Sequence, residues 1–380
     1  MKQFRKTIMI KIGITGQAGF IGTHLYNTLG LFSDEFQRID FRKECFKDEH
    51  KLNEFVAQCD VIVHLAAMNR HNDPQVIYDT NIGLVNKLIK SLEVTNSKAH
   101  VLFSSSTQEE RDNLYGKSKK EGRESMIDWA KRFGGKFTGM IIPNVFGPFG
   151  HPNYNSVIAT FCHKLAHNEI PTIDVDGDLK LIYVGELVDT IISEIRTQRG
   201  NPEVLIKHTS ESKVSQILGM LENYKSEYLE KGIIPSISNT FELNLFNTFR
   251  CYMDIKNHFP VKFIEHTDPR GSFVEIIRLG VGGQVSFSTT VPGITRGNHY
   301  HTRKIERFAV IKGKALIQLR RIGTNDVLDF YLDGNEPAYV DMPIWYTHNI
   351  KNIGDEVLYT NFWINEFYDP NDPDTYFENV

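Results

Sequence analysis

The first half of the chain alternates short apolar runs with longer segments in which apolar residues recur at helical spacing. The apolar runs predict strands at residues 10–15, ending at 38–40, at 60–65 and at 100–104. Helical periodicity follows the first run at residues 20–31 and returns most clearly at 79–92. This alternation is typical of right-handed βαβ units, whose parallel sheet is covered by helices on both faces. We therefore predict an α/β domain with a doubly wound parallel sheet.

The pattern changes after about residue 255, where helical periodicity disappears and short strands alternate with turns. Six strands are expected, at residues 274–279, 284–289, 306–310, 315–320, 327–332 and 357–363. Short strands at this spacing predict an all-β sandwich or barrel. The preceding segment, residues 231–254, is taken as the end of the first domain. We therefore expect an α/β domain at residues 1–252 and an all-β domain at residues 253–380.

Length and composition agree with two compact domains. A chain of 380 residues exceeds the size at which one hydrophobic core usually stops growing. Hydrophobic residues make up 41% and charged residues 24%, proportions that argue against a disordered chain or a fibre. A formal net charge of -4 and an isoelectric point near 6.4 leave no broad basic surface for a nucleic-acid backbone. We expect no nucleic-acid partner.

The cysteines and the hydrophobic runs bear on location. The four cysteines have no CxxC pair, which favours reduced thiols in the cytoplasm over a disulfide framework: Cys45, Cys59, Cys162 and Cys251. No apolar run approaches the ~20 residues that a membrane-spanning helix needs, and the charged start lacks the apolar core of a signal peptide. We expect a cytoplasmic protein without membrane association, in which residues 1–8 are a short extension that adds nothing to function.

A glycine-rich turn joins the first expected strand to the first expected helix. It reads Gly16-Gln17-Ala18-Gly19-Phe20-Ile21-Gly22. Glycines in this setting allow a tight turn, and the amide groups that open the helix face the pyrophosphate of a dinucleotide. We expect a dinucleotide cofactor to contact Gly16, Gly19, Phe20, Ile21 and Gly22.

A tyrosine and a lysine after the fourth strand supply chemistry for such a cofactor. Tyr115 and Lys119 are four residues apart, which places both side chains on one face of a helix. A nearby ammonium stabilises a phenolate, so Tyr115 can exchange a proton with a sugar or alcohol oxygen. With the GxxGxxG turn, this YxxxK pair resembles the extended short-chain dehydrogenase/reductase family, which has a Rossmann fold. The resemblance implies that Ser106, Tyr115 and Lys119 are catalytic, and that Tyr115 and Lys119 also contact the cofactor.

Further positions match the cofactor and substrate contacts of that family. Asn81 matches a helix asparagine, Leu65-Ala66-Ala67 matches a loop beside the cofactor, and Asn144 is an expected substrate contact. Sugar-nucleotide 4,6-dehydratases of the family carry an acidic pair directly after the catalytic hydroxyl, where this chain has Thr107-Gln108. That departure favours ketone reduction or epimerisation over dehydration, although Glu109 lies close by.

The residues after the second strand bear on the choice of cofactor. Asp40 would suit the free ribose 2′-hydroxyl of NADH, whereas Arg42 and Lys43 could hold the 2′-phosphate of NADPH. We expect NADPH, with NADH as the alternative.

The second half carries residues of the types that bind metal ions. His299 and His301 are two residues apart on an expected strand and project from the same face. With Glu306 and His348 they make a set of three imidazoles and one carboxylate, which suits zinc, iron, manganese or nickel. We expect zinc, or else another divalent metal, because no redox role is needed.

The same residues resemble the motifs of the cupins, a family of small β-barrels. Residues 293–313 fit the first cupin motif, and His348 matches the second. The second motif departs at Trp345, where a glycine is expected. The resemblance implies a cupin β-barrel, in which Trp345 could form a wall of the pocket.

Residues 268–273 and 293–300 also resemble the signature stretches of metal-free deoxysugar 3,5-epimerases of the cupin class. This resemblance implies that His299 is the catalytic base and that Arg270 and Arg296 contact a sugar nucleotide. One residue cannot easily be both ligand and base. Either His299 binds the metal and another group moves the proton, or metal occupancy is incidental.

The pairing of the two domains, with residues 153–162, 346–350 and 369–377, resembles a family of bifunctional enzymes of bacterial capsular-polysaccharide synthesis. It implies a zinc-containing homodimer that acts on a UDP-linked 2-acetamido-2,6-dideoxy-4-ketohexose. The cupin domain would epimerise C3, and the N-terminal domain would reduce C4 with NADPH. The product would be UDP-2-acetamido-2,6-dideoxy-L-talose, on the route to N-acetyl-L-fucosamine of capsule or O-antigen.

The order of the two steps follows from carbonyl chemistry. A ketone at C4 acidifies the C3 hydrogen, so a base can remove that proton and an acid can return it from the other face. Reduction of C4 ends this acidity, so epimerisation must come first. Two alternatives remain: a monofunctional reductase whose β domain only binds substrate or dimerises, and a non-enzymatic cofactor sensor.

Overall fold

The structure is a computed structural model that describes residues 9–380, so the extension expected at residues 1–8 lies outside the described residues. The described chain forms two compact units. The first comprises the residues up to 146 with residues 150–156 and 177–213, and the second comprises residues 147–149, 157–176 and 214–380. Residues 214–252 therefore group with the β-rich unit, and the expected boundary at residue 253 stays a prediction.

A six-stranded parallel sheet forms the centre of the first unit. Its order is β2-β1-β3-β4-β5-β8, and every neighbouring pair is parallel. The strands are β1 (Ile10–Thr15), β2 (Phe36–Ile39), β3 (Val61–His64), β4 (His100–Ser106), β5 (Lys136–Ile142) and β8 (Asn201–Leu205). All of β3 and nearly all of β4 are buried, because helices cover both faces. The prediction of a doubly wound α/β sheet is confirmed.

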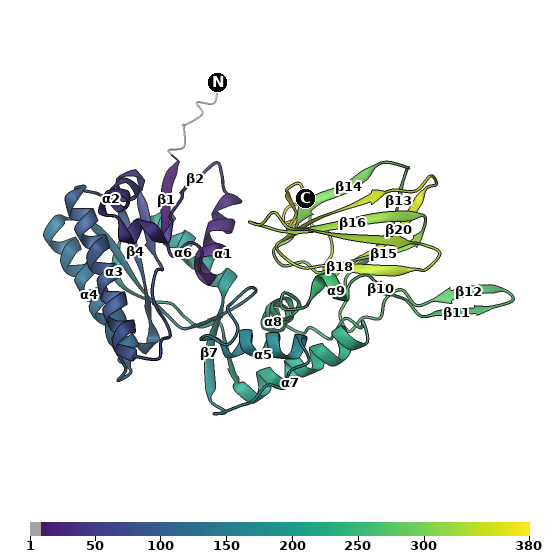
Figure 1. Cartoon of the computed structure of the whole chain (residues 1–380), viewed down its shortest axis with the longest axis horizontal. Coiled ribbons are helices and arrows are strands. Elements are labelled where there is room, and N and C mark those ends of the chain that lie inside the picture. Colours follow the sequence, from purple (N-terminus) through teal and green to yellow (C-terminus); the bar gives the residue numbers. More distant parts are fainter. Residues whose placement is uncertain (1–8) are drawn as a thin grey trace, which may run out of the picture. The chain divides into compact units, whose positions relative to one another are not determined.

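Helices cover both faces of this sheet (Figure 1). One face carries α1 (Phe20–Gly30) and α6 (Val184–Thr197), and the other carries α2 (Glu49–Gln58), α3 (Pro74–Val94) and α4 (Leu114–Phe133). The last three begin where a side chain accepts a backbone N–H of the first turn, at Asp48, Asp73 and Asn113 respectively. Two 3-10 turns, η1 (Lys43–Lys47) and η2 (Thr107–Glu110), follow β2 and β4.

A smaller sheet of order β6-β7-β9 completes the first unit. Its strands are β6 (Asn144–Phe146), β7 (Asp178–Tyr183) and β9 (Ser210–Lys213).

Two five-stranded antiparallel sheets form the β-rich body of the second unit (Figure 1). The first has the order β10-β18-β15-β20-β13: β10 (Val261–Lys262), β18 (Ala338–Met342), β15 (Glu306–Lys312), β20 (Leu358–Ile364) and β13 (Gln284–Thr290). The second has the order β17-β16-β19-β14-β21: β17 (Val327–Asp333), β16 (Lys314–Arg321), β19 (Tyr346–Asn352), β14 (Thr295–Tyr300) and β21 (Tyr376–Phe377). Phe308, Ile317 and Val340 are among their buried residues. These antiparallel sheets confirm the all-β prediction.

A separate hairpin, β11 (Glu265–Asp268) and β12 (Gly271–Val274), belongs to neither of these sheets and extends away from them in Figure 1. The prediction of a strand at residues 274–279 is wrong, because β12 ends at Val274. Beyond that residue the segment returns to the body and makes a single isolated bridge between Leu279 and Ile234. Its apolar residues therefore reflect one long-range contact and not a sheet.

The second unit also contains five helical segments: α5 (Val157–Ala166), α7 (Val214–Tyr224), the π-helical η3 (Lys225–Glu230), α8 (Thr240–Arg250) and α9 (Ile255–His258). A buried ion pair joins them to the strands. Arg307 donates to Asp341 from Nε at 2.7 Å and from Nη2 at 2.9 Å, and Tyr228 of η3 donates to the same carboxylate.

No helix within residues 9–380 has the length and apolar character needed to cross a bilayer. All four cysteines are unpaired, as the sequence predicts.

Candidate functional site

The candidate cofactor residues gather where the parallel strands end. Gly16 follows β1, Asp40 follows β2 and Leu65 follows β3, while Ser106 is the last residue of β4 and pairs with Ile142 of β5. Because the strands are parallel, these positions share one edge of the sheet. This is the edge at which open α/β sheets bind their ligands.

The glycine turn is fixed by steric limits. Gly16 has a φ of +78°, and a Cβ on Gly22 would lie 2.2 Å from the carbonyl oxygen of Gly16. Gly19 donates its N–H to that oxygen at 2.9 Å and is the N-cap of α1. Among the described residues no side chain caps α1, so the N–H groups of its first turn, at Phe20 and Ile21, can face a phosphate.

Asn81 holds the loop that follows β3. Its side chain accepts the N–H of Met68 at 2.7 Å and donates to the carbonyl oxygen of Met68 at 3.1 Å. It also donates to Ser118 of α4 at 3.0 Å. Leu65-Ala66-Ala67 is thereby anchored beside the glycine turn, where a Cβ on Gly16 would lie 2.8 Å from the Ala66 nitrogen.

The positions that bear on cofactor choice lie at the end of β2. Asp40 accepts a hydrogen bond from the Tyr26 hydroxyl at 2.9 Å, and Arg42 is the N-cap residue of η1. Both a carboxylate and a guanidinium thus stand at this end of the strand, so NADPH and NADH both stay open.

Ser106, Tyr115 and Lys119 meet at the carboxyl end of β4. Tyr115 and Lys119 lie one turn apart on α4, with Lys119 Nζ 5.9 Å from the centre of the Tyr115 ring. Tyr115 forms a hydrogen bond with Ser106, and Lys119 Nζ donates to the carbonyl oxygen of Ser104 at 2.9 Å. The structure therefore brings the three predicted catalytic side chains together.

Burial sets the acidity of the two ionisable groups. It raises the pKa of Tyr115 to about 12, while the hydrogen bond with Ser106 acts in the opposite direction. It lowers the pKa of Lys119 to about 8, against the effect of the nearby Glu109 carboxylate. At neutral pH, Tyr115 is a phenol and Lys119 is mostly an ammonium. These are the states needed to donate a proton to a ketone oxygen.

Sequence reasoning left the role of Glu109 undecided, and the structure gives it a partner. Arg123 of α4 donates to Glu109 from Nε at 2.9 Å and from Nη2 at 2.7 Å. The two side chains are only 6% and 10% exposed, so the ion pair is held inside the protein. Ser105 also donates to this carboxylate. Glu109 is therefore committed to a structural contact.

Tyr154 is a residue that sequence reasoning missed. Its phenol adds to the larger effect of burial in raising the pKa of Tyr115. Its hydroxyl accepts the N–H of Asn69 at 3.2 Å, and its carbonyl oxygen accepts from Arg70 at 2.7 Å. Its only signal in the sequence is the resemblance of residues 153–162. The predicted substrate contact Asn144 is exposed at the start of β6, directly beyond the end of β5.

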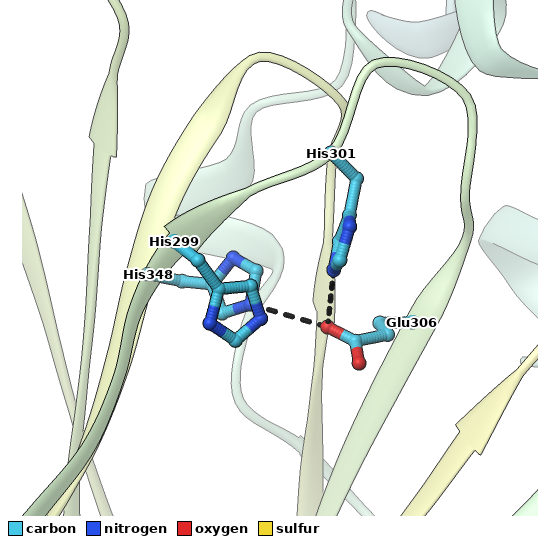
Figure 2. A group of neighbouring side chains, drawn as sticks. All are labelled: His299, His301, Glu306 and His348. Atoms are coloured by element: carbon cyan, nitrogen blue, oxygen red, sulfur yellow. Dashed lines mark hydrogen bonds and ion pairs between the residues drawn. The ribbon is translucent and has the colours of Figure 1, made fainter. Parts of the chain in front are cut away.

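His299, His301, Glu306 and His348 form one cluster in the second unit (Figure 2). His299 on β14 pairs in register with His348 on β19, His301 directly follows β14, and Glu306 begins β15. Their candidate ligand atoms all lie within 4.8 Å of one another. Figure 2 shows one carboxylate oxygen of Glu306 facing two imidazoles, with Nε2 of His301 and Nε2 of His348 each 3.1 Å from Oε2. The structure thus brings the four predicted ligands together.

This donor set fits a metal ion. Nε2 of His348 is buried and lies 3.1 Å from Oε2 of Glu306 in an ion pair. The other ring nitrogen, Nδ1, lies 3.2 Å from the carbonyl oxygen of Tyr346 and is held there. A buried carboxylate oxygen that faces two buried imidazoles is the arrangement that a bound cation would complete.

The protonation state of His299 suits either of its two predicted roles. Burial, with the neighbouring His348, lowers the pKa of His299 to about 4. The imidazole is therefore neutral at neutral pH, as both a metal ligand and a general base must be. Its role as ligand or base stays open.

Trp345 occupies the position where the cupin motif has a glycine. Its φ is +61°, so it adopts the left-handed conformation that a glycine there would take. Its backbone N–H donates to the carbonyl oxygen of His301 at 2.8 Å. Its ring stacks on the Tyr300 ring, with the ring centroids 5.7 Å apart.

The two predicted substrate arginines lie in different settings. A β-bulge between Gly297 and His299 adds one residue to β14 and shifts its alternation. Arg296 and His299 therefore lie opposite Ile350 and His348, on the same face of the sheet. Arg270 lies at the turn of the β11–β12 hairpin, where its 90% exposed side chain pairs with Asp268 at 2.6 Å. Its substrate role stays a prediction.

Comparison with known proteins agrees with both halves of this description. Residues 12–205 match the model of the NAD dependent epimerase/dehydratase family. The chain belongs to the NAD dependent epimerase/dehydratase family. Residues 266–376 match the polysaccharide biosynthesis C-terminal domain. The expectation of an enzyme that uses a nicotinamide dinucleotide is confirmed at the level of this family.

Relatives extend the match to the whole chain. The chain is 30% identical to a UDP-2-acetamido-2,6-beta-L-arabino-hexul-4-ose reductase of Pseudomonas aeruginosa, over 97% of this chain and 98% of the relative. It resembles the crystal structure of the capsular polysaccharide assembling protein CapF of Staphylococcus aureus, with 33% identity, a TM-score of 0.62, and coverage of 98% and 100%. The predicted resemblance to capsular-polysaccharide enzymes, and the fold class of a Rossmann domain with a cupin-like domain, are confirmed.

A more distant neighbour shares the fold of the first unit. RMD of Pseudomonas aeruginosa, solved in complex with NADPH, has 18% identity and a TM-score of 0.52 over 57% of this chain and 83% of RMD.

Proposed function

We propose that this protein is a bifunctional enzyme that acts on a UDP-linked 2-acetamido-2,6-dideoxy-4-ketohexose. The second unit epimerises C3, and the first unit then reduces C4 with NADPH to give UDP-2-acetamido-2,6-dideoxy-L-talose. This product would serve N-acetyl-L-fucosamine synthesis for capsule or O-antigen. One observation carries the proposal: a chain that matches a UDP-hexul-4-ose reductase over 97% of its length contains both a Ser–Tyr–Lys set and a histidine–glutamate cluster.

The first unit has the groups that ketone reduction needs. NADPH, when bound, supplies the hydride for C4. Ser106 hydrogen-bonds the carbonyl oxygen, and Tyr115 donates the proton that completes the alcohol. Lys119 stabilises the phenolate that remains and binds the nicotinamide ribose. The name of the Pseudomonas reductase and the NADPH complex of the RMD fold support this assignment.

The contacts of Glu109 favour reduction over dehydration. Loss of water from a sugar needs an acid that can reach the leaving hydroxyl. Glu109 is the nearest acidic residue after Ser106, and both of its oxygens accept hydrogen bonds from the buried Arg123. Its release would leave an unpaired guanidinium that is only 10% exposed, which is costly.

The second unit has the groups that C3 epimerisation needs. A zinc ion held by the cluster would supply positive charge to stabilise the negative oxygen at C4 during proton removal. His299 is either a ligand of that ion or the base that removes the C3 proton. Arg296, on the same face of the sheet, would contact the sugar nucleotide.

Exposed apolar residues at the end of one sheet support the proposed homodimer. Strand β13 is the last strand of its sheet, with Val285 61% and Phe287 71% exposed. Phe273 on the β11–β12 hairpin is 68% exposed. An exposed apolar edge strand is a ready surface for pairing with another chain, and the occupant we propose is a second copy. We retain the cytoplasm as the proposed location.

Two variants separate the two activities. Tyr115→Phe in the full chain should lower NADPH oxidation with the 4-keto sugar by about 100-fold or more, because the proton donor is lost. It should still exchange the C3 hydrogen for deuterium in D2O, as followed by NMR. His348→Ala should lose that exchange and still reduce a substrate that already has the epimerised configuration.

Each alternative has its own outcome in these assays. No deuterium uptake at C3 by the wild-type protein would leave a monofunctional reductase whose second unit binds substrate or dimerises. Oxidation of NADPH by Tyr115→Phe at the wild-type rate would contradict the reductase assignment and favour a cofactor sensor.

A further inference from the structure

The last residues of the chain lie against the histidine cluster. Strand β21 pairs with β14, so that Phe377 lies opposite His299 and Tyr376 opposite Tyr300. The N–H of Glu378 donates to the carbonyl oxygen of Asn298 at 3.0 Å. The C-terminal segment therefore forms part of the framework around the cluster, although it is more than 70 residues beyond β14 in sequence.

Asp374 makes the central contacts of this segment. It is 2% exposed, and all of its carboxylate contacts go to the loop between His301 and Glu306. The backbone N–H groups of Thr302, Arg303 and Lys304 donate to it at 3.0 Å each, and the Thr302 hydroxyl donates at 2.6 Å. One buried carboxylate thus fixes residues 302–304 of the four-residue backbone that joins two predicted ligands. Four donors also compensate the cost of burying its charge.

The backbone carbonyl of Asp374 contacts the imidazole of His301 directly. Its oxygen lies within hydrogen-bond distance of Nδ1, while Nε2 of the same ring faces Glu306 at 3.1 Å. A carbonyl oxygen can only accept, so Nδ1 carries a proton. Nε2 is then the nitrogen whose lone pair would bind a cation held by the cluster. Asp374 has a φ of +38°, an uncommon conformation that aspartate tolerates better than most residues and that the surrounding contacts hold in place.

We infer that Asp374 is a positioning residue of the metal site: its carbonyl sets the tautomer of His301, and its carboxylate fixes the loop that carries His301 and Glu306 towards the cation. This inference rests on the proposed function, because it assigns a purpose to the cluster. Hydrogen-bond partners behind metal ligands commonly change metal affinity by about 10–100-fold when they are replaced.

Zinc affinity of the full chain tests the inference without measuring activity. Asp374→Asn keeps the size of the side chain and its tolerance of positive φ. It replaces one acceptor oxygen with an NH2 group, which cannot accept from the two backbone N–H donors that face it. We expect its zinc Kd, from competition with a chromophoric chelator, to rise about 10–100-fold. The matched control is Asp372→Asn, because Asp372 lies on the same segment and pairs with Arg303 but not with the loop backbone. Its zinc Kd should stay within about twofold of wild type.

A second variant and a spectroscopic readout cover the case in which Asp374→Asn does not fold. Thr302→Val removes one donor to the carboxylate while preserving shape, and should weaken zinc binding by a smaller factor. In zinc-loaded wild type, nitrogen NMR of His301 should place the proton on Nδ1. Unchanged zinc affinity in folded Asp374→Asn overturns this inference but not the proposed function. If Asp374→Asn is unfolded, unchanged zinc affinity in Thr302→Val has the same meaning. A proton on Nε2 of His301 also overturns this inference. Failure of the wild type to bind zinc overturns the proposed metal as well.

Discussion

Lys119 shows how burial at a single residue sets the chemistry of the first unit. Its ammonium is enclosed beside the Tyr115 ring and donates to the Ser104 carbonyl oxygen. Burial of a cation favours its neutral form, which lowers the pKa of Lys119 to about 8. The neighbouring phenol remains protonated far above this pH, because burial raises the pKa of Tyr115 to about 12. The lysine therefore titrates first as pH rises.

This difference predicts the pH dependence of ketone reduction. The rate should hold through neutral pH and fall as pH rises through about 8, because the charged form of Lys119 is lost. Lys119→Met should remove this fall at high pH and lower kcat/KM by about 100-fold or more. The matched control, Lys117→Met, lies on the same helix with its side chain 58% exposed and should retain the wild-type profile. A falling limb that persists unchanged in Lys119→Met would assign it to another group.

Residues in local motifs were predictable, and residues whose partners are remote in sequence were not. Tyr115 and Lys119 share a helix face because of their spacing, and the two-residue spacing of His299 and His301 likewise predicts that both side chains point to one side, although His301 lies just beyond β14. The hydrogen bond that positions His301 spans 73 residues, to Asp374. No periodicity links such positions, so only the folded chain reveals them.

Strand β13 is the element whose sequence pattern and environment disagree most. It has the alternation of a sheet strand, yet Val285 and Phe287, which point to the same face, are exposed. Within residues 9–380 no strand pairs with the outer side of β13. Apolar residues at a free edge favour pairing with another chain. We therefore connect this edge to dimer formation.

A charge on this edge should abolish the dimer. Phe287→Lys places an ammonium where strand pairing would bury it, so sedimentation should give the mass of one chain where the wild type gives two. Tyr331→Lys is the control, since Tyr331 is 66% exposed on β17, the end strand of the other sheet. It should leave the mass unchanged. A dimeric Phe287→Lys protein would place the interface elsewhere.

The sequence predicted the elements with strong periodicity well, but it did not predict which elements pack together in one unit. Strands β1, β3 and β15 lie where apolar runs place them, because local pattern decides a buried strand. Residues 214–252 group with the β-rich unit through contacts such as Tyr228 with Asp341, 113 residues apart. Apolar periodicity indicates that a helix buries one face, but it does not indicate which element that face packs against.

At the scale of the whole molecule, the function that we propose makes two chemistries share one intermediate. In this proposal the second unit needs the C4 ketone to make the C3 proton acidic, and the first unit removes that ketone. A chain with both activities can therefore fix the configuration that it has just set. Neither half of the sequence alone would predict this order.

The composition of the product tests this account most directly. The full-length protein is given the UDP-linked 4-keto sugar and NADPH in D2O, and the product is analysed by NMR. We predict that every product molecule has an inverted C3 bearing deuterium from solvent and a C4 bearing hydrogen from NADPH. A reduced product that retains its original C3 hydrogen and configuration would contradict the bifunctional assignment.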